Sequence, residues 1–186
     1  PHSDAAVQEL RAISDLWLLE KRAREKRFSV GRFDPDYLNR FVVALVRENG
    51  RAIAFANVMT TGLKAKATID LMRHVPDAPN GVMEFLFTAL MLRLKDDGIV
   101  RFSLGMAPLS GLEARRGASL WSQFGAQLYR HGGHFYNFEG LRRFKDKFDP
   151  DWRPRYLACE SALPPVAPLA EASILIAGGA RGLVAR

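Results

Sequence analysis

The chain has 186 residues, 48% of them hydrophobic and 25% charged, with one cysteine and a formal net charge of +7. This composition predicts one globular domain, or one with a tail, and a sizeable core. The single Cys159 excludes an internal disulfide and fits a reducing compartment. No signal peptide is visible, and the longest apolar run, residues 82–94, is too short and too interrupted to span a bilayer.

The positive charge favours anionic partners: nucleic acid, an acidic lipid surface or phosphorylated ligands. Two segments hold much of it, residues 21–32 and 142–147. Either segment is a solvated face or a contact for anions, and charge alone does not choose between these readings.

The N-terminal half predicts a helix followed by a three-stranded meander. Apolar residues recur at helical spacing over residues 4–26. Apolar runs at 41–46, 51–60 and 66–72 predict strands, and Asn49-Gly50 between the first two is a hairpin turn signal. In a regular third strand Asp70 and Arg73 would point to opposite faces, so a joint role requires the strand to bend or end near Met72.

Residues 79–98 predict a helix from Asn80 or Gly81 to about Lys95, apolar nearly all round and therefore buried. Further elements are expected as a strand at 99–105, helices at 118–129 and 136–148, a strand at 155–159 and a weak terminal helix at 169–176. The fold class is therefore α+β, or mixed α/β, with a central sheet flanked by helices.

Four features have competing readings. The run 69–74, with an acid, a base and a histidine, is either a site at a strand end or a surface salt bridge. His131-x-x-His134 is either half a metal site, with no further ligands obvious nearby, or a pair of structural or substrate-contacting histidines. Cys159 reads as a buried, inert thiol. Lys145, at the margin of a phenylalanine stripe, is either partly desolvated or a lysine whose ammonium reaches solvent.

Several long segments together resemble one family. They are FSVGRFDPDY (28–37), DLMRH (70–74), DAPNGVM (77–83), SLGMAPLSGLEAR (103–115), HFYNFEGL (134–141) and residues 136–149. The family is that of the aminoacyl-phosphatidylglycerol synthases, also called phosphatidylglycerol lysyltransferases or multiple peptide resistance factors. The resemblance covers roughly residues 8 to 160.

The resemblance implies a bacterial inner-membrane enzyme whose cytosolic region carries two tandem acyltransferase folds of the GNAT type. This region moves a lysyl or alanyl group from aminoacyl-tRNA to a hydroxyl of phosphatidylglycerol, which gives resistance to cationic antimicrobial peptides. Residues 1–160 resemble the second fold, with a mostly antiparallel sheet, and residues 161–186 would form a tail. The partners implied are aminoacyl-tRNA, phosphatidylglycerol in an anionic membrane surface, and the first fold and membrane domain of a parent chain. The isolated chain is expected to be inactive.

The resemblance also implies site residues. Asp70, Arg73 and Lys145 match positions important for activity, and Tyr37 matches another. Chemistry suggests Asp70 as base or partner of the substrate amine, Arg73 as a phosphate or tRNA ligand, and Lys145 as a stabiliser of negative charge. We expect these three to converge on one cleft. Additional substrate-binding candidates are His74, Asn80, Glu113, Glu139 and Arg142.

Two other function classes stay open on the sequence. One is a basic module that binds tRNA or anionic lipid and has no catalytic activity of its own. The other is a coenzyme-A-dependent N-acyltransferase, although no Gly-rich pyrophosphate loop of the [RQ]-x-x-G-x-[GA] type precedes the helix at Gly81. No cofactor and no metal are expected.

Overall fold

The computed structural model describes residues 2–21, 31–108, 110, 138–156 and 158, together with 168, 171, 174 and 175. The chain divides into two compact units. The first comprises Pro1–Ser103 with Ser173–Arg186, and the second comprises Leu104–Ala172. The predicted helix at 118–129, the His131 and His134 pair, and Cys159 lie outside the described residues.

The first unit is built on a sheet of order β1-β2-β3-β4. Its strands are β1 (Val42–Glu48), β2 (Arg51–Thr60), β3 (Ala67–His74) and β4 (Phe102–Ser103). The pairs β1–β2 and β2–β3 are antiparallel, whereas β3–β4 is parallel. Asn49 and Gly50 adopt φ angles of 50° and 84°, which suit a tight hairpin between β1 and β2. The predicted meander and α+β class are therefore confirmed.

Strand β4 is much shorter than the predicted 99–105. Its pairing is limited to Phe102 and Ser103, opposite Ala67 and Thr68. The Ile99 N–H instead donates to Leu94 O (2.9 Å) and closes the end of the preceding helix. At the other end Gly105 has a φ of 75°, which is not an extended conformation. The two ends of the predicted strand are thus used for other local structure.

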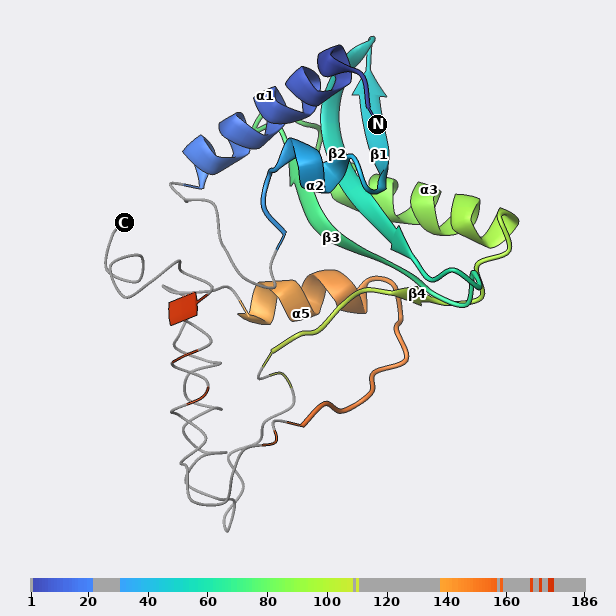
Figure 1. Ribbon diagram of the computed structural model, residues 1–186. Coiled ribbons are helices and arrows are strands. Elements are labelled where there is room, and N and C mark those ends of the chain that lie inside the picture. Colours follow the sequence, from blue (N-terminus) through green and yellow to red (C-terminus); the bar gives the residue numbers. More distant parts are fainter. Residues whose placement is uncertain are drawn as a thin grey trace. The chain divides into compact units, whose positions relative to one another are not determined.

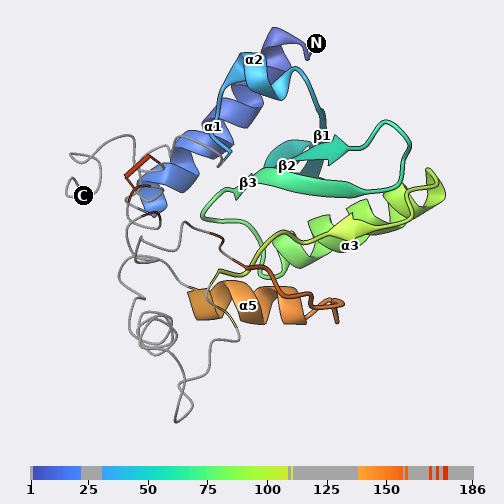
Figure 2. The same ribbon diagram turned by 60° about the horizontal axis from the view of Figure 1, so that its bottom comes forward.

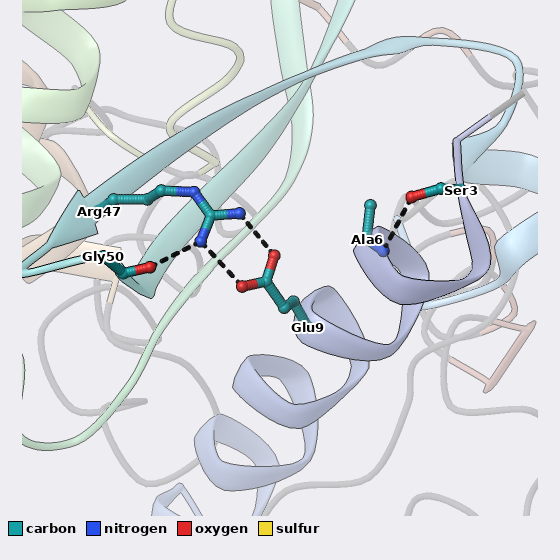
Figure 3. A network of polar contacts seen from close by, with 5 residues as sticks. All are labelled: Ser3, Ala6, Glu9, Arg47 and Gly50. Atoms are coloured by element: carbon teal, nitrogen blue, oxygen red, sulfur yellow. Dashed lines mark hydrogen bonds and ion pairs between the residues drawn. The ribbon is translucent and has the colours of Figure 1, made fainter.

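Helix α1 (Asp4–Glu20) packs on the sheet through Leu10 and Ile13, and Ser3 caps its N-terminus by accepting the Ala6 N–H. Figure 3 shows this cap and the ion pair that ties α1 to the β1–β2 hairpin. There Arg47 donates to both carboxylate oxygens of Glu9 (2.8 and 2.6 Å) and to Gly50 O (2.9 Å). The helix ends six residues before the predicted Lys26, because the apolar residues that anchor it do not continue into the basic run.

A short helix, α2 (Pro35–Leu38), was not predicted. The Asp34 side chain accepts the N–H groups of Asp36 and Tyr37, and Pro35 occupies the first helical turn. An N-cap aspartate followed by proline is a regular helix start signal. Leu38 is fully buried and anchors the turn in the core. The helix is significant because it carries Tyr37.

Helix α3 (Val82–Asp96) begins after Gly81 and ends before Gly98, both with a φ of 86°, as predicted. Figures 1 and 2 show α1 and α2 on one face of the sheet and α3 on the other. The buried side of α3 consists of Val82, Leu86, Phe87, Leu90 and Leu94. The expectation that α3 is buried all round is wrong: Phe85 and Leu92 are 61% and 59% exposed, because only one side of the helix meets the sheet.

In the second unit the clearest element is α5 (Phe138–Asp146), inside the predicted 136–148. Asp149, with a φ of 45°, turns the chain away from the helical path soon after its end. Arg155, Tyr156 and Ala158 are not in a strand, so the described part of 155–159 does not support the strand predicted there. Pro168, Glu171, Ile174 and Leu175 are helical, and the terminal helix at 169–176 stays a prediction, because most of that range lies outside the described residues. Among the described helices, none has the length and apolar content that crossing a membrane requires.

Candidate functional site

A β-bulge in the central strand pair shapes the candidate site. Ala56 pairs with Met72 and Val58 pairs with Ile69, so Asn57 alone faces both Asp70 and Leu71. The Asn57 side chain is fully buried, and its Oδ1 accepts the backbone N–H groups of Asp70 (3.2 Å) and Leu71 (2.7 Å). The amide oxygen thereby satisfies two donors that the bulge removes from the ladder.

The extra residue changes which face each side chain occupies. Asp70 and Arg73 would point to opposite faces of a regular strand. In the structure Asp70 bonds to Tyr37 of α2 and Arg73 bonds to Ser14 of α1, and both helices cover the same face of the sheet (Figures 1 and 2). The bend that the sequence required for a joint role is therefore present, and it takes the form of this bulge.

The Asp70 carboxylate is held by two donors from outside the sheet. The Tyr37 hydroxyl donates to Oδ2 (2.7 Å), and the Gly31 backbone N–H donates to Oδ1 (3.0 Å). Burial and the adjacent Asp70 raise the pKa of Tyr37 to about 12, so this hydroxyl keeps its proton at neutral pH. Each carboxylate oxygen retains lone-pair capacity for a further donor.

Gly31 permits a very close approach to this carboxylate. A Cβ on Gly31 would lie 2.6 Å from Asp70 Oδ2, 2.8 Å from Asp70 Cγ and 3.0 Å from Leu71 Cβ. These distances are shorter than ordinary contacts, so any side chain at residue 31 would displace the carboxylate or the chain around it. The glycine is therefore required by the site rather than by backbone conformation.

Arg73 is 4% exposed and packs against α1. Its guanidinium bonds to the hydroxyl of Ser14, which is fully buried, and lies 5.1 Å from the centroid of the Trp17 ring. Cation–π contact with an indole stabilises a guanidinium held away from solvent. The Arg73 side chain therefore joins the end of β3 to α1, three positions along the same strand from Asp70.

The neighbouring candidates His74 and Asn80 lie in the same unit. The His74 Nδ1 is 2.9 Å from Val75 O, a local contact at the end of β3. Asn80 is exposed in the turn that precedes α3. No hydrogen bond in this part of the chain joins either side chain to Asp70.

The second unit holds Lys145, on α5. The side chain is 6% exposed, and its ammonium donates to Met106 O (2.7 Å). Burial lowers the pKa of Lys145 to about 8. Of the two readings open on the sequence, the desolvated lysine is the one the structure contains. A lysine with this pKa exchanges its proton near neutral pH.

Arg142 also braces the segment that follows β4. It donates to Ser110 Oγ (2.9 Å) and to both carboxylate oxygens of Asp146 (3.1 Å), and its guanidinium stacks 3.6 Å from the centroid of Trp152. Glu139 is exposed at the start of α5, and Glu113 lies outside the described residues. Within the described ranges, His, Cys, Asp and Glu side chains form no group of three or more that could hold a metal ion.

The structure thus assembles Asp70, Tyr37 and Arg73 in the first unit, and Lys145 with Arg142 in the second. Convergence of Asp70, Arg73 and Lys145 on one cleft stays a prediction. Sequence reasoning missed Asn57 and Gly31. An amide inside the apolar run of β2 was the available signal for Asn57, whereas the need for Gly31 depends on a contact with a residue 39 positions away.

These observations define an α+β domain with a partly buried polar site on its central sheet. The family model for the C-terminal part of phosphatidylglycerol lysyltransferase matches residues 1–159. The chain belongs to this family.

Individual relatives match the chain over a similar length. Phosphatidylglycerol lysyltransferase of Bacillus subtilis (strain 168) is 44% identical over 160 residues, which are 85% of this chain and 18% of the relative. The C-terminal domain of a lysylphosphatidylglycerol synthetase from Agrobacterium fabrum is 47% identical, with a TM-score of 0.78 over 94% of this chain and 52% of that one. The structure of L-PGS from Bacillus licheniformis is 36% identical, with a TM-score of 0.75, and covers 95% of this chain and 52% of that one. More distant structural neighbours include a member of the GNAT acetyltransferase family.

The chain therefore spans about half the length of these solved structures and less than a fifth of the curated relatives it matches. Those relatives are named phosphatidylglycerol lysyltransferases, and a lysyltransferase is an acyltransferase.

Proposed function

We propose that this chain is the second acyltransferase fold of an enzyme that transfers an aminoacyl group, lysyl or alanyl, from aminoacyl-tRNA to a hydroxyl of phosphatidylglycerol. The observation that carries the proposal is the 44% identity to a phosphatidylglycerol lysyltransferase over 85% of the chain. The partly buried Asp70 carboxylate, held on the sheet by Tyr37 and the Gly31 N–H, supports it.

The reaction is an ester exchange. The lipid hydroxyl oxygen attacks the aminoacyl ester carbonyl, and its proton passes to a base. The tetrahedral intermediate then collapses, the bond to the ribose oxygen breaks, and that oxygen takes up a proton. The protein must therefore place an acceptor for the hydroxyl proton and donors for the negative charge that develops on the carbonyl oxygen.

Asp70 is the residue we assign to the first task, either as the base or as the partner of the substrate's ammonium group. Tyr37 and the Gly31 N–H fix the direction of its carboxylate. A carboxylate held from two sides loses little conformational entropy on binding substrate, which favours both roles. The high pKa of Tyr37 makes that residue a donor and not a competing base.

Arg73 and Lys145 take supporting roles in this proposal. Since Arg73 is 4% exposed and packs on Trp17, we assign it as a positioning residue that fixes β3 against α1, in place of direct phosphate binding. The Lys145 ammonium would stabilise negative charge on the intermediate or on the lipid phosphate. Its pKa of about 8 also allows it to donate the proton that the leaving ribose oxygen needs.

The proposal includes partners and location. Aminoacyl-tRNA and phosphatidylglycerol would be the substrates, and a first acyltransferase fold and a membrane domain would complete the parent chain at the cytosolic face of a bacterial inner membrane. An alanyl group would add one positive charge to the lipid and a lysyl group two, so cells would bind cationic antimicrobial peptides less. The reaction as written needs no cofactor.

The test is mass spectrometry of lipids from cells that express the full-length parent. Aminoacylated phosphatidylglycerol should accumulate with the natural sequence, fall strongly with Asp70→Asn, and stay unchanged with Asp96→Asn, an exposed carboxylate at the end of α3. Full accumulation of the lipid with Asp70→Asn would mean that another part of the parent carries out catalysis and that this chain is a binding module. Absence of the lipid with the natural sequence, together with thermal stabilisation of the chain by coenzyme A, would favour the N-acyltransferase.

A further inference from the structure

The loop between β2 and β3 forms an ordered tip together with the segment that precedes β4. The Thr61 N–H donates to Lys66 O (3.0 Å), and the Lys64 N–H donates to Thr61 O (2.9 Å). Lys64 has a φ of 53°, as a tight turn requires. We call Leu63, Lys64, Lys66, Val100 and Arg101 the β2–β3 tip.

Three hydrogen bonds join the two segments of the tip. Val100 N–H donates to Lys64 O (3.4 Å), Ala67 N–H donates to Arg101 O (2.9 Å), and Lys64 Nζ donates to Asp97 O (3.1 Å). The exposed side chains are therefore presented from a braced backbone. All of these residues belong to the first unit.

The tip exposes large aliphatic side chains. Leu63 is 93% exposed and Val100 is 86% exposed, the highest fractions among the leucine, isoleucine and valine residues that the structure describes. Each exposed aliphatic side chain costs free energy in water, roughly in proportion to its apolar area. Two of them on adjacent, ordered segments indicate a surface that meets an apolar environment.

Basic side chains surround these two residues. Lys64, Lys66 and Arg101 are all exposed. The acidic residues nearest in the chain are Asp70, which accepts from Tyr37 and Gly31, and Asp96 and Asp97 at the end of α3. Asp97 is paired with Arg93 (3.1 Å). The tip therefore combines apolar side chains with an excess of positive charge.

We propose that the β2–β3 tip docks onto an anionic phospholipid bilayer, with Leu63 and Val100 entering the interfacial region and the basic residues contacting headgroup phosphates. The proposal rests on the proposed function in one respect, that the substrate lipid lies in such a bilayer. A basic residue near an anionic surface contributes attraction, and an aliphatic side chain contributes burial once the surface is reached.

The aliphatic residues favour a bilayer over RNA. Phosphate contacts to RNA need only the cations, and sequence-tolerant base contacts use aromatic side chains. Neither kind of contact would explain why a leucine and a valine at this tip are 93% and 86% exposed.

The experiment measures co-sedimentation of the chain with vesicles of phosphatidylcholine alone or mixed with phosphatidylglycerol. The tip variant Leu63→Ser/Lys66→Gln is compared with Phe85→Ser/Arg51→Gln. This control also removes one exposed apolar residue and one positive charge, but from the first turn of α3 and the β1–β2 hairpin. A second tip variant, Val100→Ser/Arg101→Gln, repeats the test if the first does not fold.

The natural chain should bind the mixed vesicles more tightly than neutral ones, and less at high salt. Each tip variant should lower the partition constant on the order of tenfold, of which about fivefold comes from the lost charge. The control should change it less than twofold. No preference for anionic vesicles, or equal losses in tip and control variants, would overturn the proposal. So would tip variants that lose binding to tRNA but keep binding to vesicles.

The parent protein separates this proposal from the proposed function. Tip variants should transfer aminoacyl groups normally to phosphatidylglycerol in detergent micelles and poorly to the same lipid in vesicles. If the natural parent transfers nothing in micelles, the proposed function fails while the vesicle measurement still decides the docking proposal. Equal turnover of tip variants and natural parent on vesicles would contradict docking alone.

Discussion

Asp70 in the first unit is partly buried, whereas Lys145 in the second is 6% exposed, and the two side chains are held in different ways. Two donors hold the Asp70 carboxylate, and a buried amide shapes the strand beneath it. The Lys145 ammonium donates to the Met106 carbonyl oxygen, and burial lowers the pKa of Lys145 to about 8. The first arrangement fixes a charged group in one geometry, whereas the second keeps a proton available for transfer.

The Asp70 and Lys145 sites should therefore be sensitive to different changes. The Asp70 site depends on residues that do not themselves touch a substrate, because the bulge and the close glycine set its geometry. The Lys145 site depends on desolvation, so it should respond to pH more than to small steric changes.

The largest expected effect comes from removing the amide that holds the bulge. Asn57→Leu leaves the N–H groups of Asp70 and Leu71 without their acceptor in the core. At about 1–3 kcal/mol for each of the two unsatisfied donors, unfolding in urea should show a loss of about 2–6 kcal/mol. Asn80→Ala, at an exposed position, should stay within about 0.5 kcal/mol of the natural chain. An Asn57→Leu chain of natural stability would mean that the bulge does not need the amide.

Gly31→Ala tests the geometry of the Asp70 carboxylate by a steric change alone. Its Cβ would meet Asp70 Oδ2 at 2.6 Å, so the carboxylate must move away from Tyr37 or from the Gly31 N–H. A displacement on the order of 1 Å should cost about a hundredfold in transfer rate in the parent protein. Gly62→Ala is the matched control, because a Cβ there meets nothing within 4 Å. Equal rates for the two variants would show that the close approach at residue 31 is not functional.

The lowered pKa of Lys145 should make the free energy of unfolding depend on pH. Burial lowers its pKa in the folded chain from 10.5 to about 8, so between these values the unfolded chain binds more protons than the folded one. Stability therefore rises with pH in this window, by about 2 kcal/mol between pH 8 and pH 10. Lys145→Met should abolish that part of the rise, as urea unfolding at several pH values would measure. A rise of the same size in the variant would assign it to other groups.

The smallest effect is expected at the surface. Glu9→Gln removes the exposed ion pair to Arg47 that Figure 3 shows between α1 and the β1–β2 hairpin. Thermal unfolding should detect only a slight loss, and less of it in high salt, because exposed pairs are screened. A loss comparable to that of Asn57→Leu would indicate that the Glu9–Arg47 ion pair, and not the buried Asn57 amide, stabilises the first unit.

The sequence was sufficient for the elements with strong local signals. The hairpin at Asn49-Gly50, the extent of β2 and the glycine limits of α3 follow from turn chemistry and periodicity. Helix α2 was missed although Asp34-Pro35 is a start signal, because four residues carry no periodicity. Exposure of Phe85 on α3 could not be read from composition, since it depends on which side of the helix meets the sheet.

For the site, the resemblance named Asp70, Tyr37 and Arg73, and the structure assembles these around one face of the sheet. The sequence stated that a bend was needed but not that Asn57 would make it, because a side chain that accepts two backbone donors leaves no periodic signature. Gly31 is likewise explained only by a contact across 39 residues.

The central claim is that the Asp70 carboxylate, oriented by Tyr37, carries aminoacyl transfer. The most direct measurement is the transfer rate of the purified parent with aminoacyl-tRNA and phosphatidylglycerol, for Asp70→Asn, Tyr37→Phe and the double variant. Asp70→Asn should lower the rate by about 10²–10⁴, and adding Tyr37→Phe should lower it little further, because the tyrosine acts through the carboxylate. A rate within fivefold of the natural enzyme for Asp70→Asn would contradict the account.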